Sequence, residues 1–251
     1  MRPMLTLSRL SKSFGRLQAV QDITFQVSPG QIVGLIGPNG SGKSTLLNCI
    51  AGTITPDSGR VNFEGHDITG ASPDVVFRRG IARSHQDPAL FQRMSVLDNT
   101  PLPARHQASE SALVAPFHRQ WRTQENALAG RADGILRRLR LRNHYATRTS
   151  DLSGGQMKLL KLERSLAGEP KLMLLDEPTA GVAPNLAYEI FEQIAALRDE
   201  GLTFLIVEHR LEILFDFVDH LFVMHLGGLL ARGSPMEIAD NAAVREVYFG
   251  E

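Results

Sequence analysis

Cysteine is almost absent from this sequence of 251 residues, which has a single thiol at Cys49. One cysteine cannot form a disulfide within the chain, and neither Cys-x-x-Cys nor His-Glu-x-x-His spacing occurs. The sequence therefore excludes a disulfide framework and gives no sign of a zinc site. We expect the protein to work in a reducing, cytoplasmic setting.

Net charge and long apolar runs are also missing. The 27 Lys and Arg residues balance the 27 Asp and Glu residues, so no overall positive field would gather nucleic acid or anionic lipid. No apolar run approaches the ~18 residues that a membrane-spanning helix needs, and we expect no secretory signal in the residues that follow Met1. If the protein works at a membrane, we expect another chain to anchor it.

What the sequence does contain is two kinds of apolar pattern. Alternating residues at Leu5 to Leu10, at Gln18 to Val27 and after a predicted turn at Pro56 to Gly59 are typical of half-buried antiparallel strands. Short, almost wholly apolar runs are instead typical of strands buried on both faces of a parallel sheet. Such runs lie at residues 31–36, 171–175 and 202–207. Helical stretches separate them, so the sequence predicts an α/β core with an antiparallel β sub-sheet.

The middle of the chain has a different pattern. From about Asp87 to Ala167 the periodicity is helical and no good strand is visible. We interpret residues 1–251 as one domain, with a core lobe of residues 1–87 and 168–251 and an inserted helical lobe of residues 88–167.

A phosphate-binding loop pattern, G-x-x-x-x-G-K-[ST], lies between the predicted strand ending at Ile36 and a helix beginning near Lys43. In such a loop, backbone N–H groups surround a β-phosphate, the lysine reaches the β/γ oxygens, and Ser44 can ligate Mg²⁺. A glycine-rich strand-to-helix turn is the alternative, and the strand and helix on either side favour a Mg-ATP site. The residues predicted to contact nucleotide are Gly37, Pro38, Asn39, Gly40, Ser41, Gly42, Lys43, Ser44 and Thr45.

Two carboxylates follow the apolar run that begins at Leu172, at the strand end where α/β enzymes place their sites. We expect Asp176 to hold the water shell of Mg²⁺ and Glu177 to orient and deprotonate an attacking water. An acidic strand exit that caps a neighbouring segment is the alternative. The phosphate loop upstream favours catalysis, with Glu177 and Lys43 as catalytic residues.

The peptide Leu152 to Gln156 reads Leu-Ser-Gly-Gly-Gln. Ser153 can simply cap the helix that follows, but a helix N-terminus with a hydroxyl and two glycines is also an anion site. This peptide resembles the signature peptide of ATP-binding cassette (ABC) ATPases. The resemblance implies a P-loop NTPase core in which Ser153, Gly154, Gly155 and Gln156 contact ATP held by a second subunit of a head-to-tail dimer.

Other positions match the same family one by one. The resemblance places Phe14 where an aromatic ring stacks on adenine, Gln86 where a glutamine senses Mg²⁺ and the γ-phosphate, and His209 where a switch histidine contacts that phosphate. His209 is therefore a third candidate catalytic residue. The loop Ala180 to Ala183 departs from the family, because it lacks the usual serine and aspartate. His85 and Glu163 also replace residue types that are common in the family.

Four features resemble the ATP-binding subunits of branched-chain amino acid importers: the run Ala180 to Pro184, the peptide Val207 to Arg210, the long helical insert and the chain's end, Val247 to Glu251. Related cassettes that serve urea, short amides or other small polar solutes share much of this pattern. That resemblance implies transmembrane permease subunits and a second ATP-binding subunit as partners, a solute-binding protein acting indirectly, and a place on the inner face of the cell membrane. The membrane partner would contact apolar residues between Gln86 and Thr100, among them Phe91, Met94, Val96 and Leu97; packing within the helical lobe is the alternative.

Two other functions remain open at this point. One is a cassette ATPase that acts on nucleic acid or the ribosome, with Arg137 to Arg142 as its basic patch, although zero net charge and a solvated helix face argue against it. The other is a nucleotide-operated switch without turnover, against which Glu177 and His209 argue.

Overall fold

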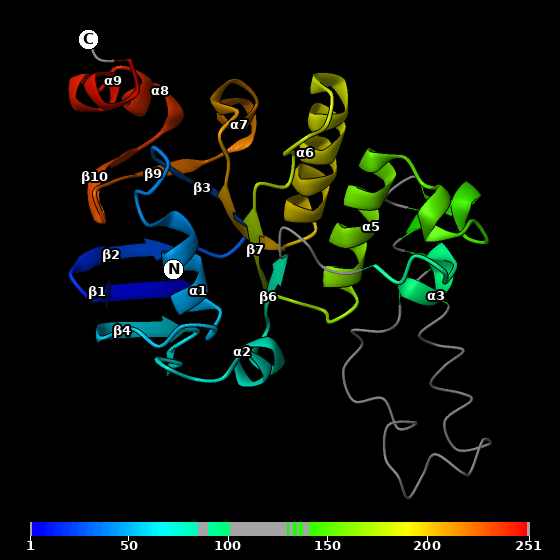
Figure 1. Ribbon diagram of the computed structural model, residues 1–251, viewed down its shortest axis with the longest axis horizontal. Helices are drawn as coiled ribbons and strands as arrows, with labels where there is room; N and C mark the ends of the chain where they lie inside the picture. Colours follow the sequence, from blue (N-terminus) through cyan, green and yellow to red (C-terminus); the bar gives the residue numbers. More distant parts are fainter. Residues whose placement is uncertain are drawn as a thin grey trace, which may run out of the picture. The chain divides into compact units, whose positions relative to one another are not determined.

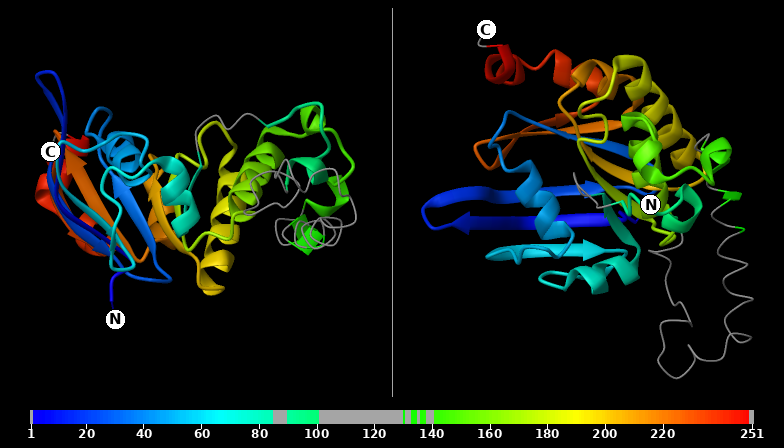
Figure 2. Two further views of the ribbon diagram at one scale, coloured as in Figure 1. Left: turned by 90° about the horizontal axis from the view of Figure 1, so that it is seen from below. Right: turned by 45° about the vertical axis from the view of Figure 1, so that its right-hand side comes forward.

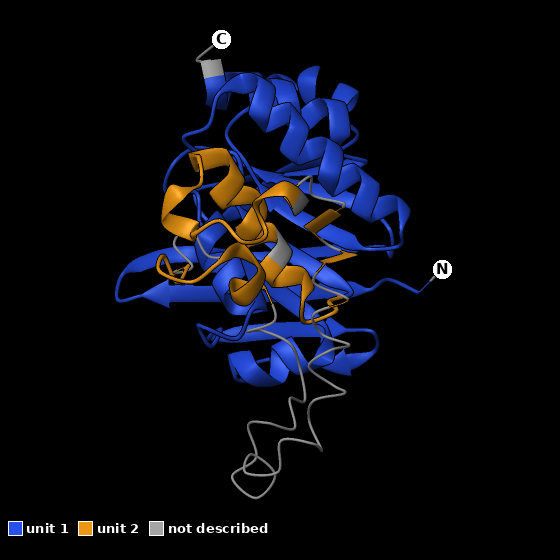
Figure 3. Ribbon diagram, turned by 90° about the vertical axis from the view of Figure 1, so that its right-hand side faces the viewer, with its two compact units in different colours: residues 1–86, 171–251 blue, residues 87–170 orange. Residues whose placement is uncertain are grey.

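The computed structural model describes residues 2–84, 90–100, 130, 133–134, 136–137 and 141–249. The chain divides into two compact units, one of residues 1–86 and 171–251 and the other of residues 87–170 (Figure 3). The assignment of the whole chain to one domain with two lobes stays a prediction. No helix in the described ranges has both the length and the apolar character needed to cross a bilayer.

The first unit contains two sheets (Figures 1 and 2). A four-stranded antiparallel sheet has the order β2-β1-β4-β5, and a six-stranded, mainly parallel sheet has the order β10-β9-β3-β8-β7-β6. The small sheet consists of β1 (Leu5–Phe14), β2 (Leu17–Val27), β4 (Ser58–Phe63) and β5 (His66–Asp67). The large sheet consists of β3 (Ile32–Ile36), β6 (Ile81–Ser84), β7 (Leu172–Asp176), β8 (Thr203–Val207), β9 (His220–His225) and β10 (Gly228–Gly233). The α/β core with an antiparallel sub-sheet is therefore confirmed.

The helices of this unit lie between or after these strands. They are α1 (Lys43–Ile50), α2 (Pro73–Arg79), α6 (Pro184–Asp199), α7 (Leu211–Phe217), α8 (Pro235–Ala239) and α9 (Ala242–Phe249). Figure 1 shows α6 and α7 following β7 and β8, and α8 and α9 together at the carboxyl-terminal end of the chain.

Burial follows the two apolar patterns of the sequence. All residues of β3, β7 and β8 are buried, as expected for interior parallel strands, while β1 and β2 alternate buried and exposed positions over much of their length. One predicted boundary was wrong: the turn at Pro56 to Gly59 is shorter, because Ser58 pairs with Ser11 of β1 and already belongs to β4.

One hydrophobic core joins the two sheets and α1. Leu46 and Leu47 of α1 are fully buried in it. Between the sheets, the rings of Phe25 in β2 and Phe222 in β9 stack with centroids 4.2 Å apart. This core fixes α1, and with it the loop that precedes α1, against both sheets.

The register of the large sheet brings three strand ends together. Val207 of β8 lies opposite Leu35 of β3 on one side and Asp176 of β7 on the other. Because these strands are parallel, the residues that follow them leave the sheet at one edge, where α/β folds place ligand sites. The phosphate loop and Glu177 directly follow two of these strand ends, and His209 lies two residues after the third.

The second unit is helical in its described part. It contains α3 (Val96–Asn99), α5 (Gly154–Leu166) and the 3-10 helices η2 (Arg142–His144) and η3 (Thr149–Asp151). Asn99 is fully buried, and its side chain bonds the N–H and carbonyl of Phe91, the carbonyl of Ser95 and the hydroxyl of Thr149. The described residues of this unit form no strand beyond an isolated bridge from Ser95 to Arg148.

Candidate active site

The phosphate loop is held tightly between the two sheets. A Cβ atom on Gly42 would lie 1.9 Å from the carbonyl oxygen of Ala19 in β2, and one on Gly37 would lie 2.1 Å from that of Met224 in β9. Both glycines also have positive φ, +101° and +150°. Any larger residue would push the loop away from the backbone behind it, so sheet packing fixes the loop's shape.

The first turn of α1 can bind an anion. Its N-cap is Gly42, no side chain caps it, and no acidic residue lies in the first turn. Its first backbone N–H groups therefore remain available, and the helix dipole adds partial positive charge there. Ser44 and Thr45 lie in this turn, with Ser44 exposed.

Lys43 lies under the loop with only 6% of its surface exposed. Its ammonium donates to the carbonyls of Gly37 at 2.7 Å and Pro38 at 2.9 Å. Burial lowers the pKa of Lys43, and the nearby charges of Glu177 and Asp176 raise it. The two carboxylates thus help to keep the ammonium charged beside the loop.

Asp176, at the end of β7, is a buried carboxylate with one oxygen in use. Its Oδ2 accepts from Arg83 of β6 at 3.1 Å, and Arg83 also donates to Asn48 of α1. Within the described part of the chain, Oδ1 is buried and has no hydrogen-bond partner. A buried carboxylate oxygen normally has a partner, so this group fits a hydrated divalent cation.

Glu177 and His209 form a direct pair. Glu177 Oε1 lies 3.0 Å from His209 Nε2, and both side chains are partly exposed. Glu177 has φ of +50°, a conformation that is strained for a residue with a side chain. Its N–H donates to the carbonyl of Val207 at 2.9 Å, and its carbonyl accepts from Ala180 at 3.1 Å.

Glu177, His209 and part of the phosphate loop line one pocket of about 280 Å³. Its lining includes Phe14, a residue that is 48% exposed and whose ring centroid lies 5.6 Å from the ammonium of Lys12. Other lining residues are Leu17, Ala19, Asn39, Gly40, Gly42, Lys43, Ser44, Thr45, Glu177 and His209. Residues far apart in the sequence therefore meet in one cleft that combines an exposed ring, an anion site and a carboxylate.

The second unit holds the peptide Leu152 to Gln156 at the start of α5. Ser153 N–H donates to Gln156 Oε1 at 2.9 Å, and Gln156 N–H donates to Ser153 Oγ at 3.3 Å. This reciprocal pair is a capping box, and Gln156 Nε2 also lies 2.9 Å from His144 Nε2. The capping interpretation of Ser153 is therefore confirmed. Ser153 and Gly154 are exposed as well, so contact with a second subunit stays a prediction.

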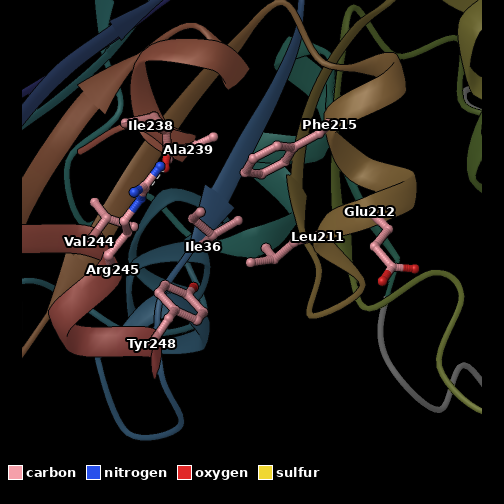
Figure 4. A pocket seen from close by; sticks show the side chains of 9 residues that line it. All are labelled: Ile36, Leu211, Glu212, Phe215, Ile238, Ala239, Val244, Arg245 and Tyr248. Carbon is pink, nitrogen blue, oxygen red and sulfur yellow. Dashed lines mark hydrogen bonds between the residues drawn. The ribbon is translucent and has the colours of Figure 1, made fainter. Parts of the chain in front are cut away.

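A second pocket, of about 520 Å³, lies beside the end of β3 (Figure 4). Figure 4 shows Leu211 and Phe215 of α7 on one side of Ile36 and Tyr248 of α9 on the other. Tyr248 accepts a hydrogen bond from the N–H of Gly37, and burial raises the pKa of its phenol to about 12. The carboxyl-terminal helix thus contacts the first residue of the phosphate loop.

Comparison with known proteins agrees with this geometry. The sequence pattern of the family described as ABC transporter matches residues 20–180, more than half of the chain. The chain belongs to the ABC transporter family. It is 40% identical to the probable branched-chain amino acid transport ATP-binding protein LivG of Methanocaldococcus jannaschii, over 99% of this chain and 98% of that one. It is 34% identical to the lipopolysaccharide export system ATP-binding protein LptB of Acidithiobacillus ferridurans, over 100% of this chain and 98% of that one.

Solved structures agree with this assignment. A crystal structure described as the ADP conformation of an ATP-binding cassette of an ABC transporter has a TM-score of 0.88 and 40% identity, with each chain covered completely. This ABC protein is accordingly an ATP-binding subunit and an ATPase. The alternative of a cassette acting on nucleic acid is not favoured. In the described part of the proposed basic patch, Arg137 is paired with Asp133 at 2.6 Å.

The predicted site residues of this ABC ATPase meet only in part. Phe14, the phosphate loop, Asp176, Glu177 and His209 all belong to the first unit, whereas Gln86 lies outside the described residues. Sequence reasoning assigned no role to Arg83, Glu208, Arg210 or Tyr248. For Glu208 the sequence did contain a signal, because a charged residue directly after a fully buried strand indicates a buried polar contact.

Proposed function

We propose that this ABC ATPase powers the import of branched-chain amino acids through transmembrane permease subunits. It would work as a dimer of ATP-binding subunits on the cytoplasmic face of the membrane, with a solute-binding protein acting indirectly. The observation that supports hydrolysis is the pocket of about 280 Å³ that joins Phe14, the phosphate loop, Glu177 and His209. The cargo is proposed from the likeness to LivG.

In this proposal ATP lies along the pocket. Phe14 stacks on the adenine ring, while the backbone of Gly37 to Gly42 and the start of α1 surround the phosphates. Lys43 gives up contacts to the loop carbonyls to reach the β/γ oxygens. Ser44 and Asp176, with Gln86, would hold Mg²⁺, which when bound neutralises developing charge on the phosphates.

Glu177 orients the attacking water and takes its proton at a carboxylate oxygen. His209, 3.0 Å from that carboxylate, fixes its direction and contacts the γ-phosphate. The exposed Ser153 and Gly154 at the start of α5 meet the nucleotide of the second subunit, where the helix N-terminus favours negative charge. Hydrolysis therefore requires two copies of this site or one copy with a related subunit.

Reconstitution tests both the activity and the cargo. The chain is co-purified with its permease subunits, placed in lipid vesicles with the solute-binding protein, and phosphate release is measured with leucine, isoleucine, valine, urea or a short amide. We expect the three amino acids to stimulate hydrolysis and Lys43→Ala to abolish it. Stimulation by urea or amides alone would refute the cargo, and full turnover in Lys43→Ala would refute the site.

A further inference from the structure

Glu208 is a buried carboxylate that the proposed chemistry does not use. It lies directly after β8 with 2% of its surface exposed. Its Oε1 accepts from the N–H of Thr179 at 2.8 Å and from the hydroxyl of the same residue. Its Oε2 accepts from the N–H of His209 at 2.9 Å. A buried carboxylate is unfavourable unless hydrogen bonds satisfy both of its oxygens. These bonds therefore hold the segment of Thr179 to the segment of His209.

Arg210 makes a second connection between the same segments. Its Nη2 donates to the carbonyl of Val182 at 2.6 Å. Val182 belongs to the loop after Glu177, in which Val182 N–H bonds the carbonyl of Thr179 at 3.4 Å. The loop is thus tied to the segment of His209 at both Thr179 and Val182.

The loop has no polar side chain of its own from Ala180 to Ala183, and Val182 is its buried residue. Its position therefore depends on its backbone, on the packing of Val182 and on polar groups that reach it from outside. It also follows Glu177, whose φ of +50° needs support from its surroundings. Glu208 and Arg210 are side chains that reach this loop from the segment of His209.

We propose that Glu208 and Arg210 form a clamp that positions the pair of Glu177 and His209 for hydrolysis. Glu208 fixes the backbone of His209 and, through Thr179, the turn that carries Glu177. Arg210 fixes the far end of that turn. The two are positioning residues: they set the distance between a carboxylate oxygen and an imidazole nitrogen without touching the reacting atoms.

The test compares variants of the full chain, assayed as the assembled ATPase. Glu208→Gln keeps the volume of the side chain but replaces one accepting oxygen with an NH₂ group that faces N–H donors. Arg210→Met removes the bond to Val182, whereas Arg210→Lys keeps a donor. Thr203→Val is the matched control, because Thr203 is fully buried at the other end of β8 and its hydroxyl accepts from Gly30 N–H at 2.8 Å.

For each variant, kcat, KM for ATP, melting temperature and affinity for a fluorescent ATP analogue are measured well below the melting temperature. We expect Glu208→Gln to lower kcat by about tenfold to a hundredfold while KM changes less than about twofold. Arg210→Met should also lower kcat with little change in KM, but by a smaller factor. Arg210→Lys should have a kcat close to that of the wild type. Thr203→Val should lower the melting temperature and leave kcat unchanged.

The inference depends on the roles proposed for Glu177 and His209, so Glu177→Gln is assayed in parallel. Loss of turnover in Glu177→Gln together with normal kcat in Glu208→Gln and Arg210→Met would overturn the clamp alone. Full turnover in Glu177→Gln would overturn the proposed catalytic roles and the clamp with them. A fall in kcat that merely follows the melting temperature, in Thr203→Val as much as in Glu208→Gln, would also overturn the clamp.

Discussion

Replacing Glu177 with glutamine separates binding from chemistry at this site. The backbone of Glu177 is held by bonds to Val207 and Ala180 that do not involve its side chain, so the substitution keeps the turn. The amide can still bond His209, which lies 3.0 Å from the carboxylate. What is lost is the proton acceptor.

The expected change follows from these contacts. Loss of a general base lowers the rate by about 10²- to 10⁴-fold, which corresponds to about 2.7 to 5.5 kcal/mol in the activation barrier. ATP affinity should stay equal or become tighter, because a negative charge beside the phosphates is removed. One of the two charges that raise the pKa of Lys43 is also lost, but that of Asp176 remains.

Phosphate release and nucleotide binding are measured on the same preparation, and light scattering follows association. We expect slow turnover, retained binding and dimers that accumulate with ATP. Glu192→Gln, on the exposed face of α6, is the matched control and should behave as wild type. Turnover within about threefold of wild type, or a large loss of ATP affinity, would refute the assignment of the base.

Three further substitutions test other parts of the assembly. Ser153→Arg should leave ATP binding to the isolated chain nearly normal and stop hydrolysis; loss of binding in the monomer would place this peptide in the chain's own pocket. Tyr248→Phe leaves the buried N–H of Gly37 without its phenol partner, so nucleotide titration should show ATP affinity about three- to tenfold weaker. Tyr145→Phe, at an exposed site, is the control and should leave the affinity unchanged. Phe91→Asp should abolish co-purification with the permease subunits while the soluble chain keeps its ATPase activity and melting temperature, since Phe91 is 53% exposed; an inactive or misfolded chain would assign Phe91 to the core.

The sequence was informative where one segment carries the whole signal. The runs that became β3, β7 and β8 are apolar at nearly every position, and the phosphate loop lies between its predicted strand and helix. The role of the apolar residues between Gln86 and Thr100 was ambiguous, because periodicity does not distinguish residues that line a binding groove from residues that pack in the core of the lobe. In the structure Val96 is fully buried and Phe91 is exposed.

Contacts between distant segments could not be predicted from the residues alone. Nothing in the pattern around Arg83 indicates that it reaches Asp176, 93 positions later. The bond between Tyr248 and Gly37 depends on how α9 packs near the end of β3, which short-range patterns do not encode. Such pairs depend on strand order and helix packing, and both are properties of the whole fold.

The packing behind Gly37 and Gly42 has a consequence for the thermodynamics of nucleotide binding. Because the carbonyls of Ala19 and Met224 leave these glycines no room to move inward, the loop loses little conformational entropy when a phosphate enters. Calorimetry should accordingly show a small entropic penalty from the loop. The amide hydrogens at the start of α1, which no side chain caps, should exchange quickly with solvent in the free protein and slowly once phosphate oxygens accept from them.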